Sequence, residues 1–371
     1  VGADALAVFK DPATGELRLA CAWGKRVRVF DPIAGGEALL VLEAGSEVAS
    51  LAVFEDPATG ALRLACGCGD GKVRVFNPAA GGEALLVLEV GDYVSALAVF
   101  TDPATGAPRL ACASGEKVVV FDPVVGGDAL LVLDIGSYVR ALAFFTDPKT
   151  GAPRLACGSD DGKVRVFDVV SGGDALLVLD AGDQVRALVA FKDLAQVRAL
   201  VAFKDLATGA LRLACASNKP YKPGKVHVFD QVAGGEALVV LEGHTDEVKA
   251  LTAFDDPATG EPRLVSGSND PCGISDVRVW NPAAGGAAIE AEAEGHSEQV
   301  EALVTFVDPA TGALRVATGS DDIRVWDADT GVALVVIDVG VEVKALAFFL
   351  DPATGAPLLA CGTGYPKRDV R

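Results

Sequence analysis

Apolar and polar positions form short runs along the chain, and the same four runs recur throughout it. In the second copy they are Val48–Phe54, Leu62–Gly67, Lys72–Phe76 and Ala84–Glu89. Each run is rich in Val or Leu and is bounded by Gly, Pro or Asp, which is typical of a β-strand. No segment shows helical periodicity with capping residues. The pattern therefore predicts an all-β protein built from units of four strands.

The pentapeptide DPATG marks each unit. It begins at Asp11, Asp56, Asp102, Asp256, Asp308 and Asp351, with near-copies that begin at Asp147 and Asp205. Proline presets φ for a type I turn, Asp can accept a hydrogen bond from the turn backbone, and Gly supplies a positive φ. We therefore expect a hairpin turn between the first and second strands of each unit, not a phosphate or calcium loop.

Four antiparallel strands that recur roughly every 40–50 residues are typical of the blades of a β-propeller. We assign residues 1–371 to one propeller, with repeats at about 1–47, 48–93, 94–138, 139–184, 185–247, 248–299, 300–342 and 343–371. The last repeat supplies two strands and the start of a third. Because two strands outside a closed ring would expose their apolar faces, we expect eight blades with the last incomplete. Seven blades are the alternative.

The fifth repeat contains a tandem duplication. The segment VRALVAFKDLAQ (Val185–Gln196) is followed at once by VRALVAFKDLAT (Val197–Thr208). The second copy runs directly into the hairpin turn, so we expect it to form the first strand of the blade. The first copy is expected to bulge between blades or to add an edge strand.

Composition excludes several classes of protein. The chain has 51 Asp and Glu residues against 32 Lys and Arg, a net charge of −19, whereas nucleic-acid binding requires a basic face. No apolar run approaches the roughly 18 residues of a membrane-spanning helix. The chain has no Met, and Asp369–Arg371 stops where earlier repeats continue. We therefore expect it to be part of a longer chain or a larger assembly.

Two segments resemble a known repeat family. Arg154–Asp168 (RLACGSDDGKVRVFD), Arg315–Asp327 (RVATGSDDIRVWD) and the dipeptides Gly243-His244 and Gly295-His296 are similar to the tryptophan–aspartate (WD) repeat. The resemblance extends over essentially the whole chain. It implies a propeller that acts as a non-catalytic scaffold for protein partners.

The resemblance also implies a buried polar network in two repeats. Its members would be His244, Ser266, Trp280 and either Asp270 or Asp276 in the sixth repeat, and His296, Thr318, Asp322 and Trp326 in the seventh. In other repeats Cys replaces the hydroxyl residue and Phe replaces Trp. An unpaired buried polar group costs about 1–3 kcal/mol, whereas replacing all partners together can be nearly neutral. We therefore expect these positions to be structural.

No catalytic or metal-binding set is expected. The three histidines belong to three different repeats, and neither Cys68 nor Cys272 completes a CxxC spacing. The Gly-rich segment Gly67–Gly71 precedes a strand and not a helix, which excludes a dinucleotide fingerprint. We predict neither enzymatic activity nor a cofactor. Six cysteines at one strand position, one per repeat, indicate buried thiols and an intracellular, reducing compartment, with the cytoplasm preferred.

Specificity is expected on one rim of the propeller. The resemblance places the loops between the second and third strands, and between blades, on one face, which we call the variable rim. The DPATG turns lie on the other, the repeated rim. The variable rim carries Trp23, Tyr93, Tyr138, Tyr221 and Tyr365, and the cations Lys25, Arg26, Lys219, Lys222, Lys367 and Arg368.

Tyr, Trp and Arg often anchor protein interfaces. We therefore predict a protein partner on the variable rim, and the cations favour one with an acidic surface. The alternative is an architectural module of a cytoskeletal, ciliary or organellar assembly. A small-molecule-binding or enzymatic propeller is the third reading.

Overall fold

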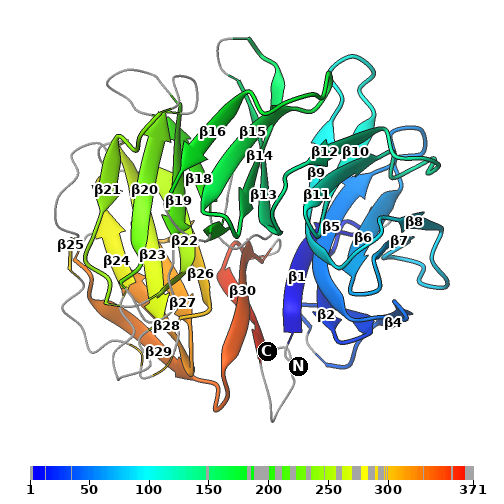
Figure 1. The fold of residues 1–371 in the computed structure, drawn as a ribbon. Helices are drawn as coiled ribbons and strands as arrows, with labels where there is room; N and C mark the ends of the chain where they lie inside the picture. The colour runs from blue at the N-terminus through cyan, green and yellow to red at the C-terminus, as the bar shows by residue number, and fades with distance from the viewer. Residues whose placement is uncertain are drawn as a thin grey trace.

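The protein is a ring of β-sheets arranged about a central axis (Figure 1). The computed structural model describes residues 3–363 except 13, 35, 148–149, 182–184, 188–199, 205–210, 218–222, 231–234, 246, 256–260, 270–276, 283–288, 291–295, 297, 299, 329 and 352–353. The elements formed by these residues are all strands, so the all-β prediction is confirmed.

Each blade is an antiparallel meander, with its first strand next to the axis. The first four blades comprise β1 (Ala3–Lys10), β2 (Leu17–Trp23), β3 (Arg26–Phe30) and β4 (Leu40–Glu43); β5 (Val48–Glu55), β6 (Leu62–Cys68), β7 (Lys72–Phe76) and β8 (Leu86–Glu89); β9 (Val94–Thr101), β10 (Pro108–Ser114), β11 (Lys117–Phe121) and β12 (Leu131–Asp134); and β13 (Val139–Thr146), β14 (Pro153–Ser159), β15 (Lys163–Asp168) and β16 (Leu177–Asp180).

The remaining sheets continue the ring. The fifth blade holds β17 (Val185–Ala187), β18 (Leu200–Lys204), β19 (Leu211–Ser217), β20 (Lys225–Asp230) and β21 (Val239–Leu241). The sixth holds β22 (Glu247–Asp255), β23 (Pro262–Asn269), β24 (Val277–Trp280) and β25 (Ile289–Glu290). The seventh holds β26 (Ala302–Val307), β27 (Leu314–Gly319), β28 (Asp322–Asp327) and β29 (Ala333–Asp338). The last sheet has two strands, β30 (Val343–Leu350) and β31 (Pro357–Thr363).

The structure has seven blades of at least four strands each. Seven is the stated alternative to the expected eight. The preferred count of eight is not confirmed, because β30 and β31 form only a two-stranded hairpin in the described part of the chain. This terminal hairpin lies between the seventh and first blades: β30 contacts both β26 and β1. The residues expected to begin a third strand, 369–371, are outside the described residues.

The core is divided among the junctions between neighbouring blades. Leu88 of β8 packs with Leu110, Cys112 and Phe121 of the next blade. Successive residues of a strand point to opposite faces of the blade. Cys66 therefore packs toward the first blade, whereas Ala65 packs toward the third. Because both faces of these strands are buried, their sequences are almost continuously apolar.

The DPATG segments form hairpin turns between the first and second strands. The backbone N–H of Asp56 donates to the carbonyl of Ala61 at 2.9 Å, and the N–H of Gly60 donates to the Asp56 carbonyl at 2.7 Å. The Asp56 carboxylate accepts a hydrogen bond from Ala58 N–H at 3.0 Å. Gly60 has φ of 67°, a conformation that favours glycine. Both oxygens of the Asp56 carboxylate are used within the blade, since the second accepts a hydrogen bond from Arg63 Nη2 at 3.2 Å.

The innermost strand of the fifth blade is assembled from both copies of the duplication, which differs from our expectation. Val185 and Ala187 pair with Ser217 and Ala216. The strand then continues in the second copy, where Leu200 pairs with Cys215. Both copies begin with Val-Arg-Ala, so either can fill the start of the strand. The intervening residues 188–199 lie outside the described residues.

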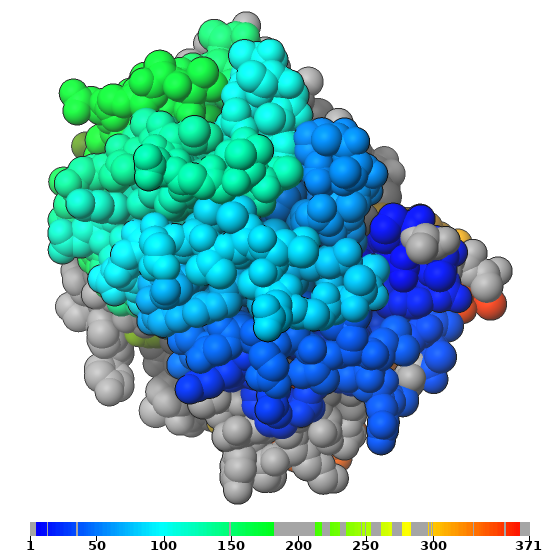
Figure 2. All heavy atoms as spheres, turned by 90° about the vertical axis from the view of Figure 1, so that its right-hand side faces the viewer, coloured from blue at the N-terminus to red at the C-terminus, as the bar shows by residue number. Residues whose placement is uncertain are grey.

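The outermost strands leave apolar side chains exposed on one face. Six blades share this pair of positions: Leu39 and Val41, Leu85 and Val87, Leu130 and Val132, Leu176 and Val178, Leu238 and Val240, and Leu334 and Val336. Figure 2 shows the side of the ring to which the first four blades contribute, in blue to green. Among the described residues, no helix is long and apolar enough to span a bilayer.

Candidate interaction site

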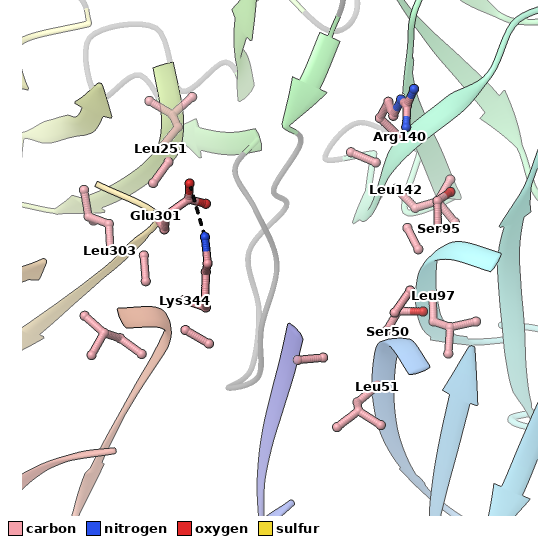
Figure 3. A pocket seen from close by; sticks show the side chains of 18 of the residues that line it. Ser50, Leu51, Ser95, Leu97, Arg140, Leu142, Leu251, Glu301, Leu303 and Lys344 are labelled. Atoms are coloured by element: carbon pink, nitrogen blue, oxygen red, sulfur yellow. Dashed lines mark ion pairs between the residues drawn. The ribbon is translucent and has the colours of Figure 1, made fainter. Parts of the chain in front are cut away.

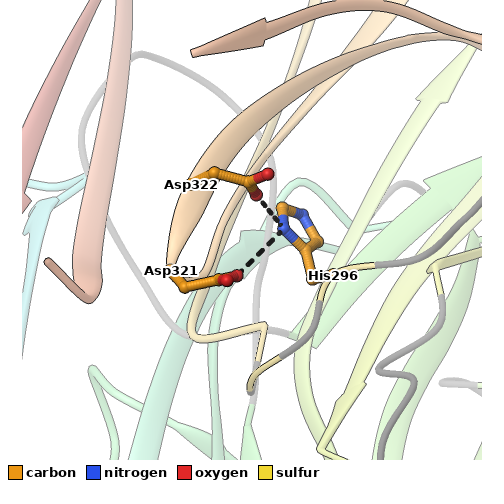
Figure 4. Close-up of side chains that lie close together, drawn as sticks. All are labelled: His296, Asp321 and Asp322. Carbon is orange, nitrogen blue, oxygen red and sulfur yellow. Dashed lines mark hydrogen bonds and ion pairs between the residues drawn. The ribbon is translucent and has the colours of Figure 1, made fainter. Parts of the chain in front are cut away.

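The seventh blade holds a buried polar network, and Figure 4 shows the part of it formed by His296 and Asp322. Trp326 Nε1 donates to the Thr318 hydroxyl at 2.8 Å, and Thr318 Oγ1 lies 2.6 Å from His296 Nε2. The other ring nitrogen of His296, Nδ1, is hydrogen-bonded to the Asp322 carboxylate. The structure thus brings together the four residues assigned to the seventh repeat.

The sixth blade holds the corresponding network. Trp280 Nε1 donates to the Ser266 hydroxyl at 2.7 Å, and Ser266 Oγ lies 2.5 Å from His244 Nε2. Asp270 and Asp276, the two alternatives for the fourth member, lie outside the described residues. Ser266, His244 and Trp280 are all buried.

His296, Asp321 and Asp322 are also close enough to be considered as metal ligands. However, both ring nitrogens of His296 are already used, one by Thr318 and one by Asp322. Burial lowers the pKa of His296 even though Asp322 acts to raise it. A neutral imidazole in a complete hydrogen-bond network indicates a structural role.

The cysteines that replace the hydroxyl residues are buried in the blade junctions. Burial raises the pKa of Cys157 to about 12, although Arg165 acts to lower it. Burial likewise raises the pKa of Cys66 and of Cys112. Because the thiolate is the reactive form, these thiols are poor nucleophiles and pack as small apolar side chains.

The strand register places the aromatic candidates on the variable rim. Val94 pairs with Ser114, and Val139 pairs with Ser159, so first strands begin where second strands end. Tyr93 and Tyr138, which immediately precede β9 and β13, therefore lie at that end of adjacent blades. Trp23 lies at the same end of the first blade, opposite Ala3.

Tyr138 forms an ordered platform with two charged residues. The guanidinium carbon of Arg140 lies 4.3 Å from the centre of the Tyr138 ring, within the range of a cation–π contact. Arg140 Nε and Nη2 donate to the two oxygens of Asp160 at 2.9 and 2.7 Å. This bidentate pair fixes the guanidinium plane over the Tyr138 ring.

A second pair of this kind lies in the first blade. The guanidinium carbon of Arg28 lies 4.1 Å from the Trp23 ring centre. Arg26 Nε lies 2.7 Å from a carboxylate oxygen of Glu43, whereas the side chain of Lys25 is exposed. Part of the positive charge expected to attract an acidic partner is therefore already paired within the blade.

Six of the candidates on the variable rim lie outside the described residues: Lys219, Tyr221, Lys222, Tyr365, Lys367 and Arg368. Sequence reasoning missed Arg28, Arg140 and Asp160. Arg28 could have been found from the sequence, because the third strand carries Arg at the same position in most repeats. Arg140 stands where the first strand varies most, and its stacking on Tyr138 follows only from the three-dimensional structure.

A cavity of about 520 Å³ opens along the axis, lined by first-strand residues of several blades. Figure 3 shows Arg140 and Ser95 on one side and Glu301 and Lys344 on the other. Lys344 Nζ lies 3.8 Å from Glu301 and 2.5 Å from Glu342. Tyr93 also lines the cavity, so the axis and the variable rim form one continuous surface.

Comparison with known proteins agrees with this architecture. Residues 132–168 match the family model described as "WD domain, G-beta repeat". No curated protein matches the chain in sequence. The matched segment runs from β12 to the end of β15 and includes Cys157 and Phe167, which replace the hydroxyl and Trp residues of the network.

Two solved structures are similar over nearly their whole length. The computationally designed Ika8 protein is 24% identical with a TM-score of 0.69, and the match covers 99% of this chain and 95% of that one. Chaetomium thermophilum Sqt1, bound to the N-terminus of the ribosomal protein L10, is 20% identical with a TM-score of 0.65, and the match covers 97% and 94%. At these identities the likeness shows the fold. The repeat match and this fold both support the resemblance of the chain to divergent WD-repeat β-propellers.

Proposed function

We propose that the protein is a non-catalytic interaction module that binds a protein partner on its variable rim. The observation that carries the proposal is the Tyr138–Arg140–Asp160 platform beside Tyr93. Tyr93 and Arg140 line the axial cavity from adjacent blades. Arg140 stacks on Tyr138 and is fixed by its bidentate ion pair with Asp160. Rigid aromatic side chains lose little entropy on binding and often anchor interfaces.

The comparison with Sqt1 supports the class of ligand. In that structure a propeller holds a segment of another protein. The same use of this chain is our proposal, since one fold serves many functions. Of the two candidate cations that the structure describes, both Lys25 and Arg26 are exposed and Arg26 is paired with Glu43. We propose that Lys25 faces acidic side chains of the partner. The buried thiols support a reducing, intracellular location as part of this proposal.

A photo-crosslinking amino acid at Tyr93 identifies the partner in extracts of the native source. Binding of the purified partner is then measured by calorimetry. Truncating an anchor typically costs about 2 kcal/mol, or about 30-fold in affinity. We therefore expect a variant with Trp23→Ala, Tyr93→Ala and Tyr138→Ala to bind at least about 30-fold more weakly.

The matched control carries Thr59→Ala, Thr105→Ala and Thr354→Ala in three turns of the repeated rim. These side chains lie at the opposite end of the blades, and the control is expected to bind like the unmodified protein. If only this control lost binding, the interface would lie on the repeated rim and the proposal would be wrong. Equal binding by both variants would favour the architectural alternative.

A further inference from the structure

The circumference of the ring exposes one sequence pattern in each of the first five blades. Among the described residues, β4, β8, β12, β16 and β21 are the edge strands of their sheets, and Figure 1 shows β8 and β21 on opposite sides of the ring. Exposure alternates along and just before the edge strand of the fourth blade. The side chains that face water there are Asp174, Leu176, Val178 and Asp180.

The equivalent positions hold an acid, Leu, Val and an acid in the other four blades. The sets are Glu37, Leu39, Val41 and Glu43; Glu83, Leu85, Val87 and Glu89; Asp128, Leu130, Val132 and Asp134; and Glu236, Leu238, Val240 and Glu242. The Leu and Val side chains of the five sets are 41–57% exposed, so packing within the ring does not account for them. We call each set an acid-flanked edge.

The backbone of each acid-flanked edge can accept a further strand. In the described part of the chain β16 is hydrogen-bonded to β15 only, and Leu176 extends this ladder by donating its N–H to the Val166 carbonyl at 2.8 Å. An edge strand leaves a row of backbone donors and acceptors on its open side. A strand added there would place its alternate side chains about 5 Å from Leu176 and Val178.

The flanking acids disfavour a second copy of the chain as this added strand. When two identical edges pair antiparallel so that Leu176 of one meets Val178 of the other, Asp174 meets Asp180 at both ends. Like charges directly opposite one another destabilise a strand pair. A strand with a cation at each end and apolar residues between them matches all four positions.

The cations of the blade itself neutralise only one end of these edges. Ion pairs join the second acid to the third strand in three blades: Arg26 with Glu43, Lys72 with Glu89, and Lys225 with Glu242. Among the described residues, the first acid forms no ion pair in any of the five blades. These first acids are Glu37, Glu83, Asp128, Asp174 and Glu236.

From this pattern of charge we propose that the acid-flanked edges bind an extended segment of a partner protein with the sequence pattern cation–x–apolar–x–apolar–x–cation. The segment adds as a strand outside the blade, with its apolar side chains beside Leu and Val and its cations beside the acids. This surface lies on the circumference, so it is separate from the variable rim. Because the edge recurs in five blades, a partner with several such segments gains affinity by binding several blades at once.

The test uses the full chain and the peptide KTVTFTK, in which photoreactive p-benzoylphenylalanine replaces Phe. Mass spectrometry locates the crosslinks blade by blade, and we expect them on β4, β8, β12, β16 and β21. A variant with Leu176→Thr and Val178→Thr should lower crosslinking to β16 at least about tenfold, because the apolar contact is lost. Crosslinking to β8 and β12 of the same molecules should not change.

Val170→Thr is the matched control. This residue is 56% exposed but lies in the connection between β15 and β16, outside the acid-flanked edge, so crosslinking should not change. The variant and the control both keep the net charge of the chain. A general attraction of the cationic peptide for the acidic protein is therefore the same in both.

A charge reversal tests the flanking acids. Asp174→Lys should lower crosslinking of KTVTFTK to β16 at least about threefold, since an attractive pair becomes a repulsive one. The peptide ETVTFTE, with the same photoreactive residue, should then crosslink to β16 more than to β8 or β12.

Four results would overturn the proposal. The first is equal crosslinking to β16 by the variant with Leu176→Thr and Val178→Thr and by Val170→Thr. The second is an unchanged preference between the two peptides at β16 of Asp174→Lys. The third is equal crosslinking by KTTVFTK, which has the same composition without the alternation. The fourth is a dimer in sedimentation at pH 7 that Leu176→Thr and Val178→Thr abolish, because a second copy then covers the edge.

Discussion

Trp280 donates its indole N–H to the hydroxyl of Ser266 at 2.7 Å, and neither side chain has more than 1% of its surface exposed. The same hydroxyl contacts His244. In the second blade the equivalent positions hold Cys66 and Phe76, which are equally buried. Polar and apolar versions of one junction therefore coexist in the same ring.

We expect Trp280→Phe to lower the free energy of unfolding by about 1–3 kcal/mol, because Ser266 loses a buried donor. Adding Ser266→Cys should recover part of this loss, since it removes one of the unpaired polar groups and restores the pair found in other blades. Denaturant unfolding of the two variants measures both effects. A neutral Trp280→Phe would show that the network contributes nothing to stability.

Gly67 is required by a close approach between blades. A Cβ atom at this position would overlap the Ser50 hydroxyl and lie 2.8 Å from Cγ1 of Val94. Overpacking of this kind costs about 1–3 kcal/mol, so Gly67→Ala should lower the unfolding midpoint. Ser50→Ala should partly rescue it, and should be tolerated alone because the Ser50 hydroxyl has no hydrogen-bond partner among the described residues. Equal stability of Gly67→Ala and the unmodified protein would contradict the packing.

The pKa of Asp161 is about 2. Burial acts to raise this pKa, but hydrogen bonds from Arg165 and Ser159 lower it by more, so it lies below its ordinary value. Because this pKa lies below the unfolded value, the ionised carboxylate stabilises the folded state above about pH 4, and this contribution is lost as the pH falls toward 2. Carboxyl NMR titration should show the pKa of Asp161 rising in Arg165→Gln. Arg154→Gln, which removes the partner of Asp168 in the same blade, should leave it unchanged.

Deleting residues 188–199 should leave the fold intact. The deletion joins Ala187 to Leu200 and yields the same protein as deletion of Val185–Gln196, because both copies begin with Val-Arg-Ala. The shortened strand keeps every backbone pair described between β19 and the strands β17 and β18. We expect an unchanged or higher melting temperature. A fall in melting temperature would show that the inserted residues contribute to the structure.

Much of the fold could be predicted because each repeat contains the same four apolar runs and the same turn residues. The turn at Asp56 and the alternating burial around Cys66 follow from residue types and spacing alone. The division of the fifth blade's inner strand could not be predicted. Val185 and Val197 begin identical tripeptides, so local sequence does not specify which copy pairs with Ser217.

The candidate site was only partly predictable. Tyr93 and Tyr138 were found because aromatic residues are rare and stand beside strand starts. The stacking of Arg140 on Tyr138 requires the two side chains to turn toward one another, and this depends on Asp160 in the turn after β14.

The outer strands have a consequence for the behaviour of the protein in concentrated solution. Paired Leu and Val side chains, such as Leu85 and Val87, face water around the circumference. A net charge of −19 at pH 7 keeps such surfaces on different molecules apart by mutual repulsion. Near the isoelectric point of about 4.5 that repulsion disappears. The ring should then cluster and precipitate while its blades are still folded.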